Sequence, residues 1–372
     1  MKQSPEVIVC VGTGGVGKTT ISSAIAVSSA LKGKKTLVMT IDPARRLAQA
    51  MGIKELTNTP TPVPVQAFRP CIKNENITLD AMILETKTTF NNLIRKYSSS
   101  PQKAEAILNN SYYQYVSSEL TGSEDYMAME KLYEIKKEYN YDLIVVDTPP
   151  ARHAINFLTA PNRLIQLISS GVLKWLIKPS KNIGIIGLNI LNRAPQRVLK
   201  LLKNYVGLEI VEELIEFFSE FDELYSGFKA RAKEVHALLS SKKVQFYMVT
   251  APTHEAIEEA IYFYSIMKDY NINFAGFIIN KIHEPFFNDP QRKEISKLQD
   301  TMDKEHPIRI MLDEILTLDR IAIHDIEWVK YLKTKIRSKH IKYYLSYLVM
   351  DEELMNLCSL VKLSQYLEGI IE

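Results

Sequence analysis

The chain has 372 residues and a mass of 42.5 kDa, which is enough for one large α/β domain with an inserted module or for two domains. Hydrophobic residues make up 46% and charged residues 24% of the chain, as in an ordinary globular protein, which excludes a disordered or low-complexity chain. The net charge of +3 favours no particular partner, and no nucleic acid partner is expected.

The three cysteines, Cys10, Cys71 and Cys358, are far apart in the sequence. Their spacing predicts neither a disulfide framework nor a zinc site, and it fits a reducing cytosol. Because Met1 leads almost directly into the first predicted strand, we expect no signal peptide. No stretch approaches about 18 uncharged apolar residues, so no membrane span is expected. These features together predict a cytoplasmic location.

A glycine-rich stretch follows the first predicted strand. Val7–Val11 is apolar and is typical of a buried parallel strand, and Gly12–Thr19 matches the P-loop pattern G-x-x-x-x-G-K-[ST]. A chance glycine-rich turn is the alternative, which the lysine, the threonine and the preceding strand argue against. In a P-loop, backbone N–H groups and the lysine bind phosphate oxygens, and the threonine hydroxyl ligates Mg²⁺. The predicted nucleotide-binding residues of this stretch are Gly14, Gly15, Val16, Gly17, Lys18, Thr19 and Thr20.

A helix is predicted over Thr19–Leu31, and a second strand over Thr36–Ile41 ends in Asp42. An acid at the carboxyl end of a strand beside a P-loop lies at the ligand edge of a doubly wound sheet, where it can position an attacking water. The other interpretation is a helix cap, since Asp-Pro-Ala opens a helix well. Both interpretations can hold, because a cap needs only one carboxylate oxygen.

The next signal is a strand that also ends in an acid. Residues 51–71 are rich in Pro and Thr and predict an extended surface loop or a short edge strand. Amphipathic helices are predicted over Leu79–Tyr97, Pro101–Val116 and Met127–Tyr139. The apolar strand that begins near Tyr141 ends in Asp147, the pattern of an acid that holds Mg²⁺ through water. With the P-loop present, Thr19 and Asp147 are the predicted metal-binding pair, and Thr148–His153 is a turn at the γ-phosphate edge.

Residues 161–240 contain no predicted strand and form an inserted helical subdomain, so the nucleotide-binding domain comprises 1–160 and 241–372. Within the insertion, Ile183–Leu191 has few polar positions. It is either a buried core helix or an apolar surface for a partner.

The αβ alternation then resumes, with strands over Val244–Thr250, Phe274–Ile279 and Ile308–Met311 and a helix that begins at Thr253. Asn280 and Lys281 follow one of these strands, where an amide can read the adenine edge. The basic run from Lys330 to Lys342 is either a solvated face or a contact for an acidic partner or lipid. The predicted fold is therefore an α/β P-loop NTPase, with a mainly parallel, doubly wound sheet flanked by helices and an all-helical insertion.

These motifs resemble those of the ArsA/Get3 ATPases, within the SIMIBI group of P-loop NTPases. The matching pieces are the P-loop, Thr40–Ala44, Val146–His153, the helical insertion and Asn280, and they cover nearly the whole chain. The resemblance implies that Asp42 activates the attacking water while Lys18 binds the phosphates. It also implies a nucleotide-gated homodimer whose helical subdomain forms a client or regulatory surface.

The sequence departs from the family pattern at three points. Thr13 stands where the family has a lysine that reaches the partner's phosphates. Arg45, Arg46 and Arg152 are candidates to replace that charge, with Arg152 as the first choice. No C-x-x-C is present, and the cysteines do not cluster, so zinc and arsenite sites are not expected.

Three functions are compatible with these observations. The first is a Mg-dependent ATPase that couples ATP and ADP states to dimer conformation and to a hydrophobic protein client or membrane-associated partner. The second is a nucleotide-dependent chaperone or scaffold with little ATP turnover, which Thr13 favours. The third is a synthetase that uses ATP to activate a carboxylate, which the large apolar insertion argues against.

Overall fold

The computed structural model describes residues 5–42, 44–64, 66, 71, 77–110, 113–114, 123–149, 230–270, 272–303, 305–338, 340–347 and 357–371. The chain divides into two compact units. The first unit comprises Met1–Leu84, Tyr139–Ile155 and Ser240–Glu372, and the second comprises Glu85–Glu138 and Asn156–Leu239.

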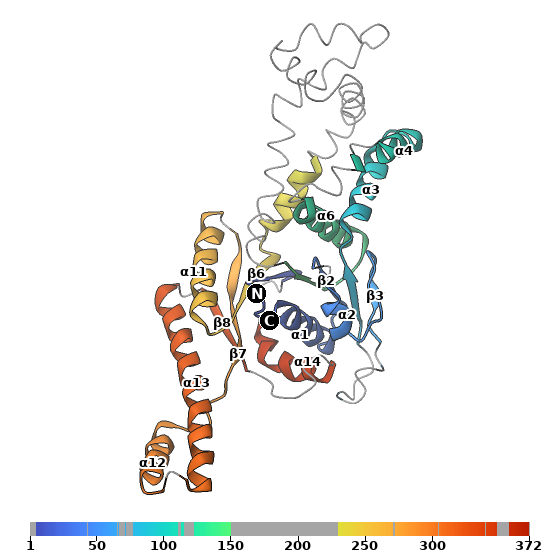
Figure 1. The fold of residues 1–372 in the computed structure, drawn as a ribbon. Helices are drawn as coiled ribbons and strands as arrows, with labels where there is room; N and C mark the ends of the chain where they lie inside the picture. The colour runs from blue at the N-terminus through green and yellow to red at the C-terminus, as the bar shows by residue number, and fades with distance from the viewer. Residues whose placement is uncertain are drawn as a thin grey trace, which may run out of the picture. The chain divides into compact units, whose positions relative to one another are not determined.

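The first unit is built on an eight-stranded sheet with the order β3-β4-β2-β5-β1-β6-β7-β8 (Figure 1). Its strands are β1 (Val7–Gly12), β2 (Thr36–Thr40), β3 (Thr61–Pro62), β4 (Leu79–Ile83), β5 (Leu143–Asp147), β6 (Val244–Thr250), β7 (Phe274–Ile282) and β8 (Lys342–Tyr347). Every neighbouring pair is parallel except β3 and β4, which are antiparallel. The predicted mainly parallel sheet with flanking helices is confirmed.

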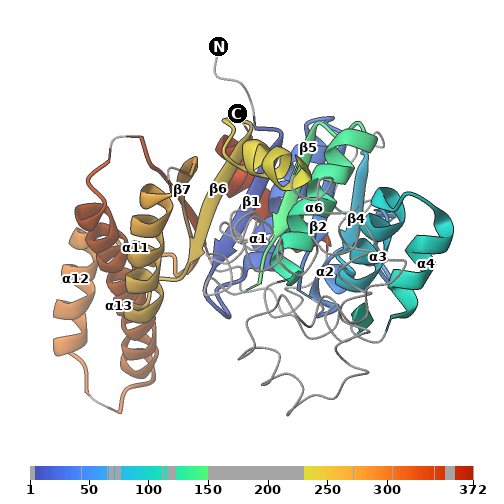
Figure 2. The ribbon, with the colours of Figure 1, turned by 90° about the horizontal axis from the view of Figure 1, so that it is seen from above.

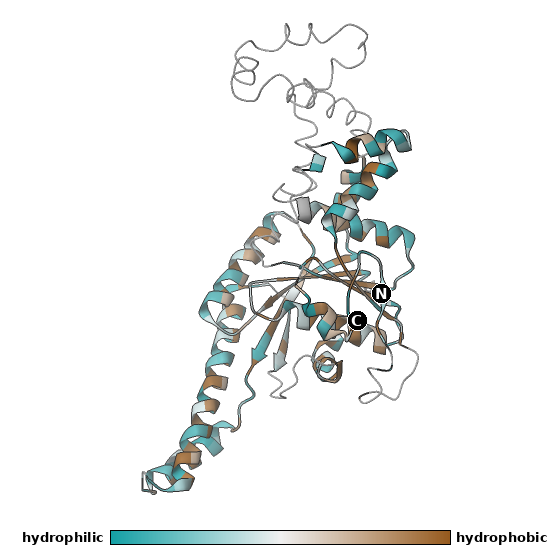
Figure 3. Ribbon diagram, turned by 45° about the vertical axis from the view of Figure 1, so that its right-hand side comes forward, coloured by the Kyte–Doolittle hydropathy of each residue, from teal (hydrophilic) through white to brown (hydrophobic). Residues whose placement is uncertain are grey.

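The central strand β1 explains why this sheet forms. It pairs with β5 on one side and β6 on the other, and all of its residues are buried. A parallel strand covered on both faces needs a continuous apolar run, which Val7–Val11 supplies. The central strands are accordingly coloured mostly as hydrophobic in Figure 3.

Helices cover the sheet of the first unit. They are α1 (Lys18–Leu31), α2 (Arg46–Ala50), α11 (His254–Asp269), α12 (Asp289–Asp300), α13 (Pro307–Lys335), α14 (Leu357–Ser364) and the 3₁₀ helix η3 (Gln365–Ile370). Helix α14 packs along α1, while α11 packs on β6, β7 and α13 (Figures 1 and 2).

Three predicted elements of the first unit were wrong in type or missing. Leu79–Ile83 is strand β4 and not the start of a helix. The prediction failed because a short apolar run does not distinguish the 3.6-residue period of a helix from the two-residue period of a strand. Ile308–Met311 lies within α13, which Pro307 opens at its first position and the His306 side chain caps. The basic run ends in an edge strand, β8, which the lysines at 330–342 concealed.

The second unit contains α3 (Thr86–Tyr97), α4 (Pro101–Asn109) and α6 (Ser123–Glu138), and a helical segment at residues 230–239. Two buried side chains, Arg231 and Glu130, form an ion pair with Nε and Oε1 2.6 Å apart. The Arg231 guanidinium also lies 3.6 Å from the ring centroid of Tyr133. The predicted apolar stretch Ile183–Leu191 lies outside the described residues.

None of the helices in the described part of the chain is both long enough and apolar enough to cross a membrane.

A buried carboxylate fixes α12 against α13. Asp319 is fully buried and accepts hydrogen bonds from the backbone N–H groups of Phe286 and Phe287. It also pairs with Arg292, whose Nε lies 2.5 Å from its Oδ2. Burial would raise the pKa of Asp319, but the hydrogen bonds from Arg292 and Phe287 outweigh it and hold that pKa below its ordinary value.

Replacement of this carboxylate tests the attachment of α12. Asp319→Ala should lower the free energy of unfolding by about 3 kcal/mol, because it leaves the Nε–H of Arg292 and two backbone N–H groups without their acceptor. Asp289→Ala is the matched control, since Asp289 also pairs with Arg292 but its side chain is 90% exposed. Its effect should stay below about 1 kcal/mol. Urea denaturation followed by circular dichroism measures both.

The same pair gives a pH test. A carboxyl group whose pKa is lowered in the folded chain stabilises it above the unfolded pKa, and this contribution is lost as the pH falls through the folded value. The difference between wild type and Asp319→Ala should therefore shrink below about pH 4. A difference that is constant down to pH 2 would show that the charge of Asp319 contributes nothing.

Candidate active site

The glycine-rich loop leaves β1 and enters α1 in a conformation that only glycines allow. Gly15 and Gly17 have φ angles of 79° and 89°, in the left-handed region. A side chain at Gly17 would also overlap the amide of Asn280, and one at Gly12 would overlap the carbonyl of Val249 on β6. The loop therefore lies tightly against two neighbouring strands, with its backbone at the carboxyl edge of the sheet.

Lys18 is buried at the first position of α1, and its Nζ donates to the carbonyl oxygen of Thr13, 2.7 Å away. Burial lowers the pKa of Lys18, and the nearby carboxylates of Asp147 and Asp42 oppose this shift. The ammonium is thus held inside the loop on a single carbonyl oxygen. Such an arrangement can exchange that carbonyl for a phosphate oxygen at small cost.

Asp147, the last residue of β5, is held by two threonine hydroxyls. Thr19 Oγ1 and Thr40 Oγ1 both donate to its Oδ2, at 2.7 and 3.0 Å. The carboxylate is buried, and its other oxygen, Oδ1, has no hydrogen-bond partner among the residues that the structure describes. Burial raises the pKa of Asp147 to about 6, against the hydrogen bonds from the two threonines, which lower it.

The environment of Asp147 fits a magnesium ion. An unpartnered buried carboxylate oxygen is costly unless a ligand completes it, and Mg²⁺ prefers oxygen ligands. The hydroxyl of Thr19 is a second oxygen within hydrogen-bond distance of the same carboxylate. The structure thus brings the two predicted metal ligands, Thr19 and Asp147, together.

Asp42 uses one carboxylate oxygen to cap the turn that precedes α2. Its Oδ1 accepts from the backbone N–H of Ala44, 2.9 Å away, while its own N–H donates to Thr40 Oγ1. The capping interpretation thus describes one oxygen of a half-buried carboxylate. Asp42 also lies close enough to influence the charges of Lys18 and Asp147. It therefore belongs to the same polar cluster at the end of the sheet.

Asn280 and Lys281 fasten the end of β7 to the P-loop. The Asn280 amide nitrogen donates to the carbonyl oxygen of Val16 at 2.9 Å, and Lys281 Nζ donates to that of Gly15 at 2.8 Å. Lys281 has a φ of 62°, a conformation that a residue with a side chain rarely adopts. The strain places its ammonium beside the loop. Ser346 of β8 donates to Oδ1 of Asn280 at 2.9 Å and fixes the orientation of the amide.

The other predicted residues have varied surroundings. Gly14 is exposed on the loop and Thr20 is half-buried in the first turn of α1. Thr13 is buried, while Arg45 and Arg46 are exposed in the segment that follows Asp42. The first candidate to replace the missing lysine, Arg152, lies outside the described residues.

Sequence reasoning missed two contributors to this site, Thr40 and Ser346. Thr40 ends β2 and is the register partner of Asp147 on β5, so the ends of adjacent parallel strands were a usable signal. No signal was available for Ser346, because it lies on β8, a strand that the sequence did not predict.

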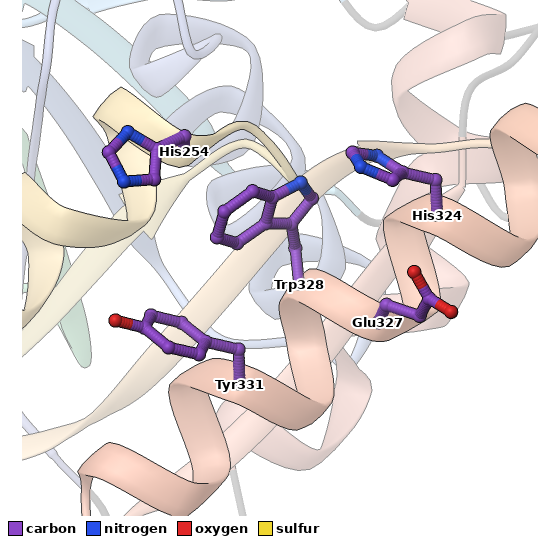
Figure 4. A pocket seen from close by; sticks show the side chains of 5 residues that line it. All are labelled: His254, His324, Glu327, Trp328 and Tyr331. Atoms are coloured by element: carbon purple, nitrogen blue, oxygen red, sulfur yellow. The ribbon is translucent and has the colours of Figure 1, made fainter.

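A separate pocket lies where α11 meets α13. Figure 4 shows the Trp328 indole between the imidazoles of His254 and His324, with Glu327 and Tyr331 completing the lining. The ring centroids of His254 and His324 lie 5.4 and 5.8 Å from that of Trp328. None of the predicted nucleotide-binding residues lines it.

A parallel sheet, a glycine-rich loop that begins a helix with Lys-Thr, and an acid on the adjacent strand together define a P-loop nucleoside triphosphatase. The sequence profile of the family described as Anion-transporting ATPase matches residues 5–307. The chain belongs to this family and is an ATPase, as the P-loop and the resemblance predicted.

Curated relatives agree with this assignment. A putative arsenical pump-driving ATPase 2 from Aquifex aeolicus is 27% identical over 274 residues, which cover 73% of this chain and 78% of that protein. The ATPase ASNA1 homolog 1 from Paramecium tetraurelia is 24% identical, with 82% of this chain and 85% of that protein covered. The ATPase GET3 from Malassezia globosa is 29% identical over a shorter region, 42% of this chain and 43% of its own.

The pKa of Asp147 predicts a pH-dependent metal affinity. Asp147 has to lose its proton before it binds a cation, so the apparent affinity for Mg²⁺ should fall as the pH is lowered, by about tenfold between pH 7 and pH 5. Mg²⁺ titrations of the chain bound to a fluorescent ATP analogue measure this. Asp147→Asn should retain only the pH dependence of the nucleotide itself. Equal pH profiles for the two proteins would exclude Asp147 as the titrating ligand.

Proposed function

We propose that the chain binds Mg·ATP at the P-loop, hydrolyses it with Asp42 as the residue that positions water, and uses the nucleotide state to control a homodimer and a client surface. The observation that supports this most directly is the buried, half-satisfied carboxylate of Asp147 beside the Thr19 hydroxyl. Mg²⁺, when bound there with Thr19 and Asp147 as ligands, would neutralise phosphate charge.

The first step is phosphate binding by Lys18. Its ammonium leaves the Thr13 carbonyl for a phosphate oxygen, and the loop N–H groups and the N-terminus of α1 surround the same phosphates. The ammonium charge of Lys18 is paired with an opposite charge only when a nucleotide is bound. Thr19 and Thr40 meanwhile keep the Asp147 carboxylate in one orientation.

Asp42 then orients the attacking water. Its Oδ1 is held by the N–H of Ala44, so the carboxylate has a fixed direction, and its second oxygen is the group that accepts from water. A nucleotide whose γ-phosphate contacts this segment would hold it in place, and hydrolysis would release it. The hydrogen bond from the Ala44 N–H to Asp42 thus supports catalysis, because it orients the carboxylate toward the water.

Asn280 and Lys281 complete the nucleotide site on the side of the adenine base. Asn280 is already oriented by Val16 and Ser346, so its amide is presented to the adenine edge at little entropic cost. Lys281 supports the loop from the same strand through Gly15.

The dimer and the client surface are proposed on the resemblance and on the family. The helical insertion of residues 161–240, which contains the apolar stretch Ile183–Leu191, would form the surface for a hydrophobic protein or a membrane-associated partner. A cytoplasmic location fits such a role. The remaining residues, 1–160 and 241–372, would form the nucleotide-binding domain.

A chaperone or scaffold with slow turnover is the second candidate. Thr13 favours it, because a buried, uncharged threonine side chain cannot form an ion pair with the phosphates bound by a partner subunit. In this alternative the chain binds ATP through Lys18 and releases phosphate rarely. The rate of steady-state phosphate release distinguishes the two.

Asp42→Asn tests the catalytic role. The substitution keeps an acceptor for the Ala44 N–H but loses the charge, so kcat for ATP hydrolysis should fall at least about 100-fold, while the ATP Kd changes less than about threefold. Lys18→Ala is the binding control and should lose ATP affinity instead. Hydrolysis at the wild-type rate in Asp42→Asn would remove Asp42 from catalysis.

Nucleotide control of a dimer gives an independent test. Analytical ultracentrifugation should show a species of twice 42.5 kDa, and its sedimentation coefficient should be larger with a non-hydrolysable ATP analogue than with ADP. Lys18→Ala should give the same coefficient in both conditions. A chain that stays monomeric at every concentration and with every nucleotide would contradict the dimeric switch.

A further inference from the structure

A covalent bridge joins two segments of the first unit that lie far apart in the sequence. Cys71 lies between β3 and β4, Cys358 is the second residue of α14, and the structure pairs them in a disulfide across a sequence separation of 287 residues. Their Cα atoms are 5.4 Å apart, within the usual range for disulfides. The expectation that these distant cysteines stay unpaired is therefore wrong. Both residues are half-buried, so the bridge lies at the surface.

The bridge holds a helix that covers the nucleotide-binding helix. The leucines of α14 that face inward share one core cluster with the apolar face of α1: Leu357, Leu360 and Leu363 with Ile21 and Ile25. Figure 1 shows α14 beside α1. Since α1 begins with Lys18 and Thr19, the position of α14 bears on the helix that presents both phosphate-binding side chains.

The bridge also lies close to the segment that follows Asp42. The Leu357 side chain, next to Cys358, lies 4.0 Å from the place of a Cβ atom on Gly52. Gly52 directly follows the turn that ends α2, and α2 begins four residues after Asp42. The disulfide therefore fastens α14 where the phosphate-binding helix and the Asp42 segment approach each other.

We propose that Cys71 and Cys358 form a reversible thiol–disulfide site that controls nucleotide affinity. A dithiol reductant attacks one sulfur, the S–S bond breaks, and the reductant leaves as its own disulfide after it has given two electrons and two protons to the cysteines. A small-molecule disulfide reverses the exchange. In the oxidised chain α14 is clamped and α1 is held for ATP. In the reduced chain only non-covalent contacts hold α14.

The third cysteine provides an internal reference. Cys10 is fully buried in β1, and burial raises the pKa of its thiol to about 12. It stays protonated and inaccessible in the folded chain, so it does not exchange. Any thiol that reacts under native conditions therefore belongs to the Cys71–Cys358 pair.

The first test counts thiols in the full-length chain. After treatment with a small-molecule disulfide, native labelling with a maleimide should add no group, and after reduction with dithiothreitol it should add two, at Cys71 and Cys358. Peptide mapping by mass spectrometry assigns the sites, and Cys10→Ser should behave identically. Two free thiols in the oxidant-treated chain would overturn the proposal, whatever the nucleotide site does.

The second test measures the consequence, and only its nucleotide part rests on the proposed function. Reduction should lower the melting temperature by about 5 °C or more and weaken binding of a non-hydrolysable ATP analogue at least about threefold, and reoxidation should restore both. Cys71→Ser and Cys358→Ser should match the reduced chain and ignore the redox state, while Cys10→Ser should respond as wild type does.

A confirmed bridge whose removal leaves the ATP analogue Kd unchanged would overturn control of the site. The reduced wild-type chain supplies this comparison even if a serine variant fails to fold. Absence of ATP binding in every redox state would instead count against the nucleotide site itself, so the two failures are distinguishable.

Discussion

The buried carboxylate of Asp147 is the constraint on which the nucleotide site depends. It lies at the end of β5, which β1 and β2 flank on either side. It accepts hydrogen bonds from the hydroxyl of Thr19, which follows β1, and from the hydroxyl of Thr40 at the end of β2. A charge in this position is costly when unpaired, and burial accordingly raises the pKa of Asp147 to about 6. A cation bound at this carboxylate, as proposed, would remove the penalty.

The parallel sheet makes this arrangement possible. Because the carboxyl ends of parallel strands meet at one edge, the P-loop after β1, Asp42 after β2, Asp147 at the end of β5 and Asn280 near the end of β7 converge there from four regions of the chain. Close backbone packing fixes the loop in place, since Gly12 touches β6 and Gly17 touches Asn280. The Lys18 ammonium donates a hydrogen bond to the Thr13 carbonyl oxygen inside the loop.

The parts of this site that the sequence predicted are those whose chemistry is local. A P-loop, an acid after a strand and an Asn-Lys pair can each be recognised from adjacent residues, and all three lie at one edge as expected. What the sequence could not predict depends on tertiary partners. Ser346 lies on β8, which follows a basic run interpreted from the sequence as a solvated face or a partner contact. The Cys71–Cys358 bridge joins residues 287 positions apart. Pro307, in contrast, is a local signal that was misinterpreted: proline at the first helical position favours a helix, and Ile308–Met311 lies within α13.

The central claim is that the Thr19–Asp147 pair and Lys18 bind the Mg²⁺ and phosphates of ATP. A crystal structure with Mg²⁺ and a non-hydrolysable ATP analogue tests it most directly. It should show the metal liganded by Thr19 Oγ1 on the side of Asp147, with Lys18 Nζ moved from the Thr13 carbonyl to the β- and γ-phosphates. A bound analogue that leaves Lys18 on Thr13, with its phosphates away from the loop, would contradict the claim.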